Sequence, residues 1–89
     1  MLTESAGESA LLLKALSHPT RLRIVALIRE QRPCVKSMEE LLGVSQPNLS
    51  QHLSLLRHAG VVESERDGNQ VCYRIKNERV LKLLDALSH

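Results

Sequence analysis

A helix-ending signal and a helix-starting signal lie almost side by side near the middle of this 89-residue chain. Gly43 can adopt the left-handed backbone conformation that ends a helix, and Ser45 is a good N-cap for the next one, with Pro47 in its first turn. The segment before Gly43 starts with a capping-box pattern, because Ser37 is followed three positions later by Glu40. These signals predict two short helices joined by a tight turn.

The helix expected after Ser45 is apolar along a narrow stripe only, formed by Leu49, Leu53 and Leu56, and Gly60 ends it. Its other surface carries uncharged amides and hydroxyls: Gln46, Asn48, Ser50, Gln51 and Ser54. Amides can bond to adenine through two hydrogen bonds, and a serine hydroxyl can donate or accept at either kind of base pair. An ordinary solvated helix face could also be polar. However, an uncharged polar face on the second helix of a tightly joined pair favours contact with the edges of DNA bases.

Two more helices are expected before this pair. The first spans about residues 4–16, and its second half is apolar nearly all round. The second begins near Pro19, which fits the first turn of a helix, and ends within residues 31–33. Its expected buried stripe consists of Leu22, Val25, Ala26 and Ile28.

The hydrophobic period changes after Gly60. Residues 61–66 and 70–76 have strand character, and the sequence Asp67–Gly68–Asn69 between them is a strong hairpin signal. Alternation along the second strand places Val71, Tyr73 and Ile75 on one face and Gln70, Cys72 and Arg74 on the other. Four helices followed by a hairpin and a last helix predict a mainly α fold with a β-hairpin wing, the winged helix-turn-helix.

Both terminal helices are more hydrophobic than a monomer requires. Asn77 should cap the last one, over about residues 78–88, and its apolar residues again cover more than one side. A chain of this size buries only a modest fraction of its surface on folding. We therefore expect one domain over residues 1–89 that forms a homodimer through its N- and C-terminal helices.

Four stretches carry a resemblance to a known family: LSHPTRLRI (residues 16–24), GVSQPNLSQHLSLLR (43–57), AGVV (59–62) and YR (73–74). With them the chain resembles the arsenic-repressor-like (ArsR/SmtB) family of bacterial metal- and stress-sensing repressors. The resemblance covers nearly the whole chain. It implies a dimeric repressor that binds a double-stranded DNA operator and is released from it by an inducer or a stress signal.

The resemblance also implies where DNA is contacted. The start of the helix after Ser45 would enter the major groove, and the hairpin tip would approach the adjacent minor groove. The resulting candidates are Ser45, Gln46, Pro47, Asn48, Ser50, Gln51, His52, Arg57, Arg66, Asn69 and Gln70. Arg57 could contact a phosphate or could cap its own helix.

Positive charge is concentrated between Lys14 and Lys36, where six basic residues accompany a single acid. Such a segment is typical of a phosphate-binding surface, and a solvated helix face is the alternative. Because the hairpin region is balanced in charge, long-range attraction to DNA is expected from the arginines of the second helix. Arg21 and Arg23 could instead form salt bridges within the fold.

The metal sites that the resemblance suggests are incomplete. One family site uses a Cys-x-Cys pair, but here Lys36 follows Cys34 at the second position, and a cation there opposes metal binding. A second site uses Asp and His on the terminal helices, and Asp85 and His89 are weak candidates for it. We therefore expect no metal and no cofactor.

The two cysteines could have a redox role instead. No signal peptide or long apolar run is apparent, so we expect a cytoplasmic protein with reduced thiols that does not enter a membrane. Cys34 is then a small buried hydrophobe, whereas Cys72 shares a strand face with Arg74 and could be reactive. Relatives that sense oxidants or persulfides usually carry paired cysteines on the second and last helices, and the last helix here has none.

The sequence also bears on other classes of function. With Tyr73 as its single aromatic residue, the chain lacks the stacking platform that single-stranded nucleic acid requires. It shows no nucleophile–base–acid set and no phosphate loop, so we expect no enzyme. A thiol-based repressor, a ligand-independent regulator and a winged-helix module for protein contacts remain as alternatives.

Overall fold

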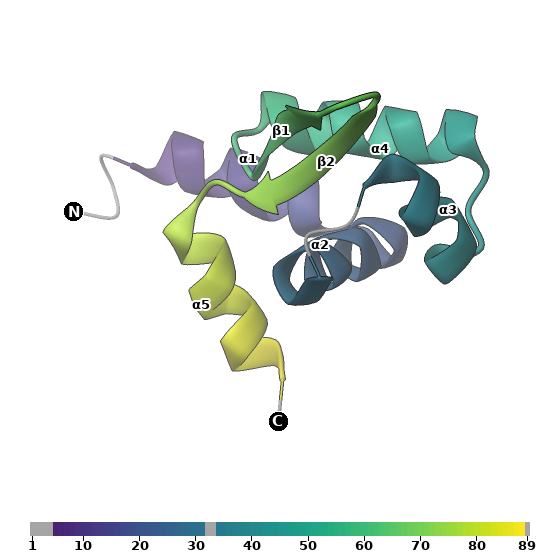
Figure 1. The fold of residues 1–89 in the computed structure, drawn as a ribbon. Coiled ribbons are helices and arrows are strands. Elements are labelled where there is room, and N and C mark those ends of the chain that lie inside the picture. Colours follow the sequence, from purple (N-terminus) through teal and green to yellow (C-terminus); the bar gives the residue numbers. More distant parts are fainter. Residues whose placement is uncertain (1–4, 32–33, 89) are drawn as a thin grey trace.

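The computed structural model of the chain describes residues 5–31 and 34–88. They form a mainly α fold with one antiparallel hairpin (Figure 1). In chain order the elements are α1 (Ala6–Leu16), α2 (Pro19–Gln31), α3 (Val35–Leu42), α4 (Gln46–His58), β1 (Val62–Asp67), β2 (Gln70–Ile75) and α5 (Glu78–Leu87). This order confirms the winged helix-turn-helix that the sequence predicts.

The core is aliphatic and lies where α1, α2, α4 and the start of the hairpin meet. Its buried residues are Leu12, Ala15, Leu16, Ile24, Val25, Ile28, Met38, Leu49, Leu53, Leu56, Val61, Val62, Val80 and Leu84. The stripe expected on α2 was wrong in part, because Ile24 is buried while Leu22 and Ala26 are only half-buried. The stripe expected on α4 is confirmed in full.

The turn between α3 and α4 forms as expected at its glycine. Gly43 has φ 66°, in the left-handed region, and its N–H donates to the Glu39 carbonyl at 3.0 Å. The start of α3 differs from the expectation, because the helix begins at Val35 with Cys34 as its N-cap. The capping box at Ser37 is therefore wrong. Cys34 forms an isolated antiparallel β-bridge with Cys72, and this long-range pairing decides where the chain turns into α3.

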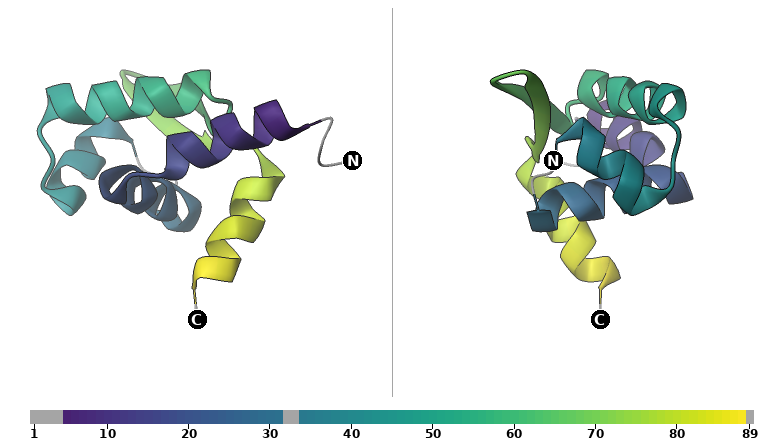
Figure 2. Two further views of the ribbon diagram at one scale, coloured as in Figure 1. Left: turned by 180° about the vertical axis from the view of Figure 1, so that it is seen from behind. Right: turned by 45° about the vertical axis from the view of Figure 1, so that its right-hand side comes forward.

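The hairpin, which we call the wing, is in the expected place. β1 pairs with β2 from Val62 opposite Ile75 to Asp67 opposite Gln70, so Gly68 and Asn69 make the turn. Gly68 has φ 64°, which suits a tight turn between two strands. The wing and α4 lie on the same side of the molecule, and α5 extends toward the opposite side (Figures 1 and 2).

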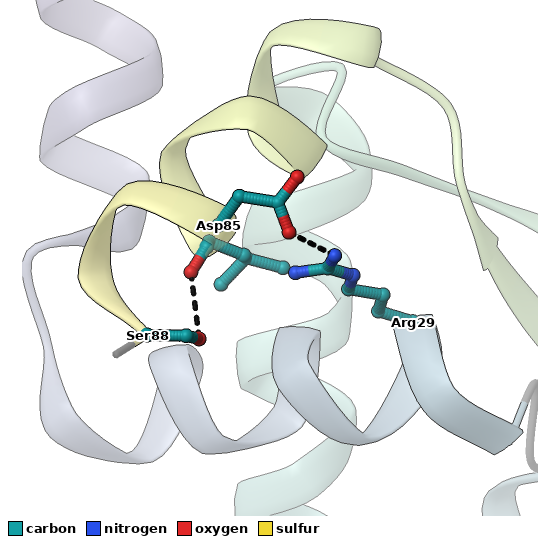
Figure 3. A network of polar contacts seen from close by, with 4 residues as sticks. Arg29, Asp85 and Ser88 are labelled. Atoms are coloured by element: carbon teal, nitrogen blue, oxygen red, sulfur yellow. Dashed lines mark hydrogen bonds and ion pairs between the residues drawn. The ribbon is translucent and has the colours of Figure 1, made fainter.

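α5 begins as the sequence predicts, since the Asn77 side chain accepts a hydrogen bond from the Arg79 N–H at 2.9 Å. Val80 and Leu84 bury one side of the helix. On another side, the Asp85 carboxylate forms an ion pair with the Arg29 guanidinium of α2 (Figure 3). None of the helices in the described parts of the chain combines the length and the hydropathy that a membrane crossing needs.

Candidate DNA interface

The N-terminal half of α4 presents an uncharged polar surface to solvent. Because Leu49 and Leu53 anchor the helix in the core, most of its polar residues at and before Gln51 turn outward. Exposed in this way are Gln46, Pro47, Asn48, Ser50 and Gln51. The Ser45 side chain makes no capping hydrogen bond, so it leaves the first N–H groups of α4 open to an incoming phosphate.

A hollow of about 570 Å³ separates this surface from the wing. Gln46 and Ser50 of α4 line one wall, Asn69 and Gln70 of the wing tip line the other, and Lys36 of α3 contributes a cation. The structure thus brings together the α4 and wing residues that the sequence marked separately. In a winged helix bound to DNA, the sugar–phosphate backbone that separates the major groove from the minor groove would lie between α4 and the wing.

His52 is placed differently from the other candidates on α4. Its ring packs inward, 4.8 Å from the ring of His18 between centroids. Burial, together with the nearby His18 and Arg21, lowers the pKa of His52 below the ordinary value of 6.5. His18 is itself held at the start of α2, where its Nδ1 accepts a hydrogen bond from the Thr20 N–H at 3.1 Å.

The arginines of α2 are engaged within the fold. Arg21 Nε donates to the Ala15 carbonyl at 2.6 Å, and Arg23 Nη2 donates to the Leu42 carbonyl at 3.1 Å. Each guanidinium therefore satisfies a carbonyl at the C-terminal end of another helix, where a positive charge is favourable. The expectation that the α2 arginines supply the attraction to DNA is not supported for these two residues, because both are held within the fold, with backbone carbonyls as the hydrogen-bond acceptors. Arg32 lies outside the described residues.

Exposed cations are instead found around the α4 surface and the wing. Lys36, Arg57 and Arg66 are all solvent-exposed. Arg74 is occupied, since it pairs with Glu63 at 2.6 Å and lies 3.8 Å from Glu65. These carboxylates raise the pKa of Arg74 and neutralise its charge on the outer wing face.

The two cysteines are the main correction to the sequence-based interpretation. Cys34 and Cys72 are joined by a disulfide between the N-cap of α3 and β2, with their Cα atoms 3.8 Å apart. The expected reduced thiols are thus paired in this structure, and Cys34 is half-buried at a junction rather than buried between helices. A separation of 38 residues gives no local pattern from which this pair could be recognised.

The weak metal candidates are not brought together. Asp85 is engaged by Arg29, and His89 lies outside the described residues. Within residues 5–31 and 34–88, no three His, Cys, Asp or Glu side chains are grouped as metal ligands would be. The structure therefore assigns Asp85 to the contact between α5 and α2.

Sequence comparison agrees with the winged helix-turn-helix fold. The model of the bacterial regulatory protein arsR family matches residues 18–64, which include α2, α3, α4 and the first part of the wing. The chain belongs to the arsR family of bacterial regulatory proteins. The resemblance drawn from the sequence is thereby confirmed.

Individual relatives match over nearly the whole chain. The HTH-type transcriptional repressor SmtB of Mycobacterium tuberculosis is 44% identical over 87 residues, which are 97% of this chain but 62% of that protein. The biofilm growth-associated repressor of Xylella fastidiosa is 43% identical over 92% of this chain and 72% of its own length. The crystal structure of the repressor BigR from Xylella fastidiosa superposes with a TM-score of 0.88 at 41% identity, covering 97% of this chain and 88% of that one.

Proposed function

We propose that this arsR-family chain is a sequence-specific DNA-binding transcriptional repressor. The observation that carries the proposal is the exposed surface at the N-terminal half of α4, which faces the wing across an open hollow. The first residues of such a helix contact base edges in the major groove. Relatives that match nearly the whole chain are named as repressors, which supports repression rather than activation of transcription.

In the proposed complex, neutral side chains read the bases. Gln46, Asn48 and Gln51 offer amides, and Ser50 offers a hydroxyl, so A·T pairs are expected at some of the positions read. Lys36, which shares the hollow with Gln46 and Ser50, and Arg57 in the last turn of α4 would contact phosphates, and Arg66 and Asn69 would bring the wing toward the minor groove. His52 supports α4 from within, because its ring is turned toward His18.

The repressor is proposed to bind as a homodimer. Leu13 of α1 and Leu83 of α5 line an apolar hollow of about 340 Å³, and Leu87 is exposed on the same helix as Leu83. A two-fold axis through this surface would aim two copies of α4 at half-sites about one helical turn apart, roughly 34–36 Å. An inducer or stress signal would then lower the affinity of the dimer for its operator.

The first experiment is binding to duplex DNA from the promoter region of the chain's own gene, followed by fluorescence anisotropy. If phosphates are neutralised, the logarithm of affinity falls linearly and steeply with the logarithm of salt concentration. Footprinting should show two symmetric half-sites. A flat salt response would instead favour a winged-helix module for protein contacts, and a footprint without two-fold symmetry would contradict the dimer.

Specific reading is tested by Gln46→Ala and Gln51→Ala. Each variant should lose about 1–3 kcal/mol of binding free energy if its amide bonds to a base edge. The matched control is Gln31→Ala, which removes an equally exposed amide at the end of α2. If the wild type and the three variants all bind the operator and unrelated DNA with equal affinity, base reading by α4 is ruled out.

A further inference from the structure

The Cys34–Cys72 disulfide joins two parts of the molecule that lie 38 residues apart in the chain. Cys34 is the N-cap of α3, and Cys72 lies in the middle of β2. Their backbones meet in a single isolated β-bridge rather than in a continuous strand pair. The covalent bond therefore reinforces the junction between the helix pair and the wing.

This junction is part of the wall of the candidate DNA interface. Cys34 lines the same hollow as Gln46 and Ser50 of α4 and as Asn69 and Gln70 of the wing tip. Cys72 is adjacent in β2 to Val71 and Tyr73, which line it as well. The bond therefore fixes β2 to the start of α3 beside this hollow.

The hollow is open while the bond is formed. It has a volume of about 570 Å³, and its charged lining consists of Lys36 and Glu39 of α3. Fixing a binding surface in its open form lowers the ordering cost of association and so increases affinity. Without the bond, the wing would be held at this point by the β-bridge and its packing alone.

The surroundings of the two sulfur atoms suit reversible chemistry. Both cysteines are half-buried rather than enclosed in the core. Cys34 lies at the N-terminus of α3 beside the exposed Lys36, whereas the hollow at Cys72 is balanced in charge, with Arg66 and Arg74 beside Glu65 and Asp67. A helix N-terminus favours the thiolate, which is the form that attacks peroxides and disulfides, so Cys34 is the first candidate for the attacking sulfur.

We propose that Cys34 and Cys72 form a redox-controlled clamp that strengthens operator binding when it is oxidised. This inference rests on the proposed DNA-binding function and names the class of signal that controls it. Reduction would free the wing and weaken repression. The clamp lies at the junction of α3 and β2, away from the terminal helices proposed for the dimer.

The chemistry balances with a peroxide as oxidant and a dithiol as reductant. One thiolate attacks the peroxide O–O bond, which gives a sulfenic acid and releases water or an alcohol. The second thiol then displaces the hydroxyl, which leaves as water, and the S–S bond forms with a net loss of two electrons and two protons. A dithiol reverses this by two exchanges through a mixed disulfide, and is itself oxidised to a disulfide.

The test compares operator binding by the full chain after treatment with hydrogen peroxide and after treatment with dithiothreitol. Mass spectrometry under non-reducing conditions confirms the bond by the loss of two hydrogens. The oxidised protein should bind the promoter fragment about tenfold more tightly than the reduced protein. Cys34→Ser, Cys72→Ser and the double variant should bind like the reduced protein and should not respond to either reagent.

A second readout does not depend on DNA. Backbone amides of β2 should exchange hydrogen faster in the reduced protein and in the serine variants than in the oxidised protein, because the wing opens more often. Equal or weaker operator binding by the oxidised form, or identical exchange in both forms, would overturn the clamp. If neither form binds duplex DNA in a salt-dependent way, the proposed function fails, while mass and exchange still report on the disulfide.

Discussion

His52 shows how a single residue of the proposed DNA-binding helix can serve the fold. The polar residues before it in α4 are exposed, whereas the His52 ring is half-buried against His18. Burial and the charges of His18 and Arg21 lower its pKa, so the ring is held neutral in the folded protein at neutral pH. In the unfolded chain the same ring takes up a proton near its ordinary pKa of 6.5.

A pH dependence of stability follows from this shift. As the pH falls through 6.5, the unfolded state binds the proton first, so stability is lost until the pH drops below the lower pKa of the folded state. His52→Gln removes this contribution. Its urea unfolding midpoint should therefore decline less between about pH 7.5 and pH 5.5 than that of the wild type. Parallel declines in the two proteins would show that His52 is not responsible.

At the scale of an element, α5 depends on a few contacts with the body of the protein. Val80 and Leu84 are buried, and the Arg29–Asp85 ion pair joins α5 to α2 at the surface (Figure 3). The Asp85 side chain is 63% exposed, so water and salt screen the pair. Exposed pairs contribute about 0–1 kcal/mol, whereas removing a buried leucine side chain costs about 2–5 kcal/mol.

Apolar burial should therefore hold α5 more firmly than the ion pair does. Leu84→Ala is expected to reduce the free energy of unfolding by about 2–4 kcal/mol, and Asp85→Asn by less than about 1 kcal/mol. Urea denaturation at low and high salt measures both values, and the small Asp85→Asn effect should shrink at high salt. A larger loss for Asp85→Asn than for Leu84→Ala would contradict this account.

At the scale of the whole molecule, the apolar residues that the chain leaves uncovered are concentrated on α1 and α5. Leu11, Leu13 and Leu87 are 55%, 54% and 68% exposed. α5 extends away from the side that carries α4 and the wing, whereas α1 runs alongside α4 (Figure 2). A second copy that covers Leu13 and Leu87 would therefore lie by α5, away from the proposed DNA surface at the N-terminal half of α4.

The proposed dimer is tested by Leu13→Lys, which places a charge in the middle of this surface. Sedimentation velocity should show a dimer for the wild type and a shift to monomer for the variant, with weaker operator binding. Leu41→Lys is the matched control, because Leu41 is also 54% exposed but lies on α3. If Leu13→Lys stays dimeric, or if both variants dissociate alike, the interface lies elsewhere.

Much of the fold could be predicted because its signals are local. Gly43 and Gly68 adopt positive φ values at the turns where glycine was expected, and Asn77 caps α5 through its own side chain. The leucines of α4 lie at helical spacing and are buried, which leaves its polar residues outside. Each of these features depends on residues close together in the chain, so periodicity and capping chemistry are enough to find them.

At the start of α3, a local capping pattern is overridden by a contact with a residue far away in the chain. Ser37 and Glu40 have capping-box spacing, yet the helix starts at Val35 because the backbone at Cys34 pairs with β2. A side-chain cap contributes about 1 kcal/mol, so a backbone pairing within the fold can outweigh it. The sequence contains no sign of that pairing.

By itself, the sequence determined the order of the elements, the turn residues and the polar face of α4. Each of these features depends only on residues that are close together in the chain. The tertiary structure alone decided which charges and thiols meet. Arg21 and Arg23 could have faced DNA, but packing places them on the carbonyls of Ala15 and Leu42. The cysteines likewise become partners only when β2 crosses the start of α3, because contacts between residues far apart in the chain arise from packing rather than from spacing.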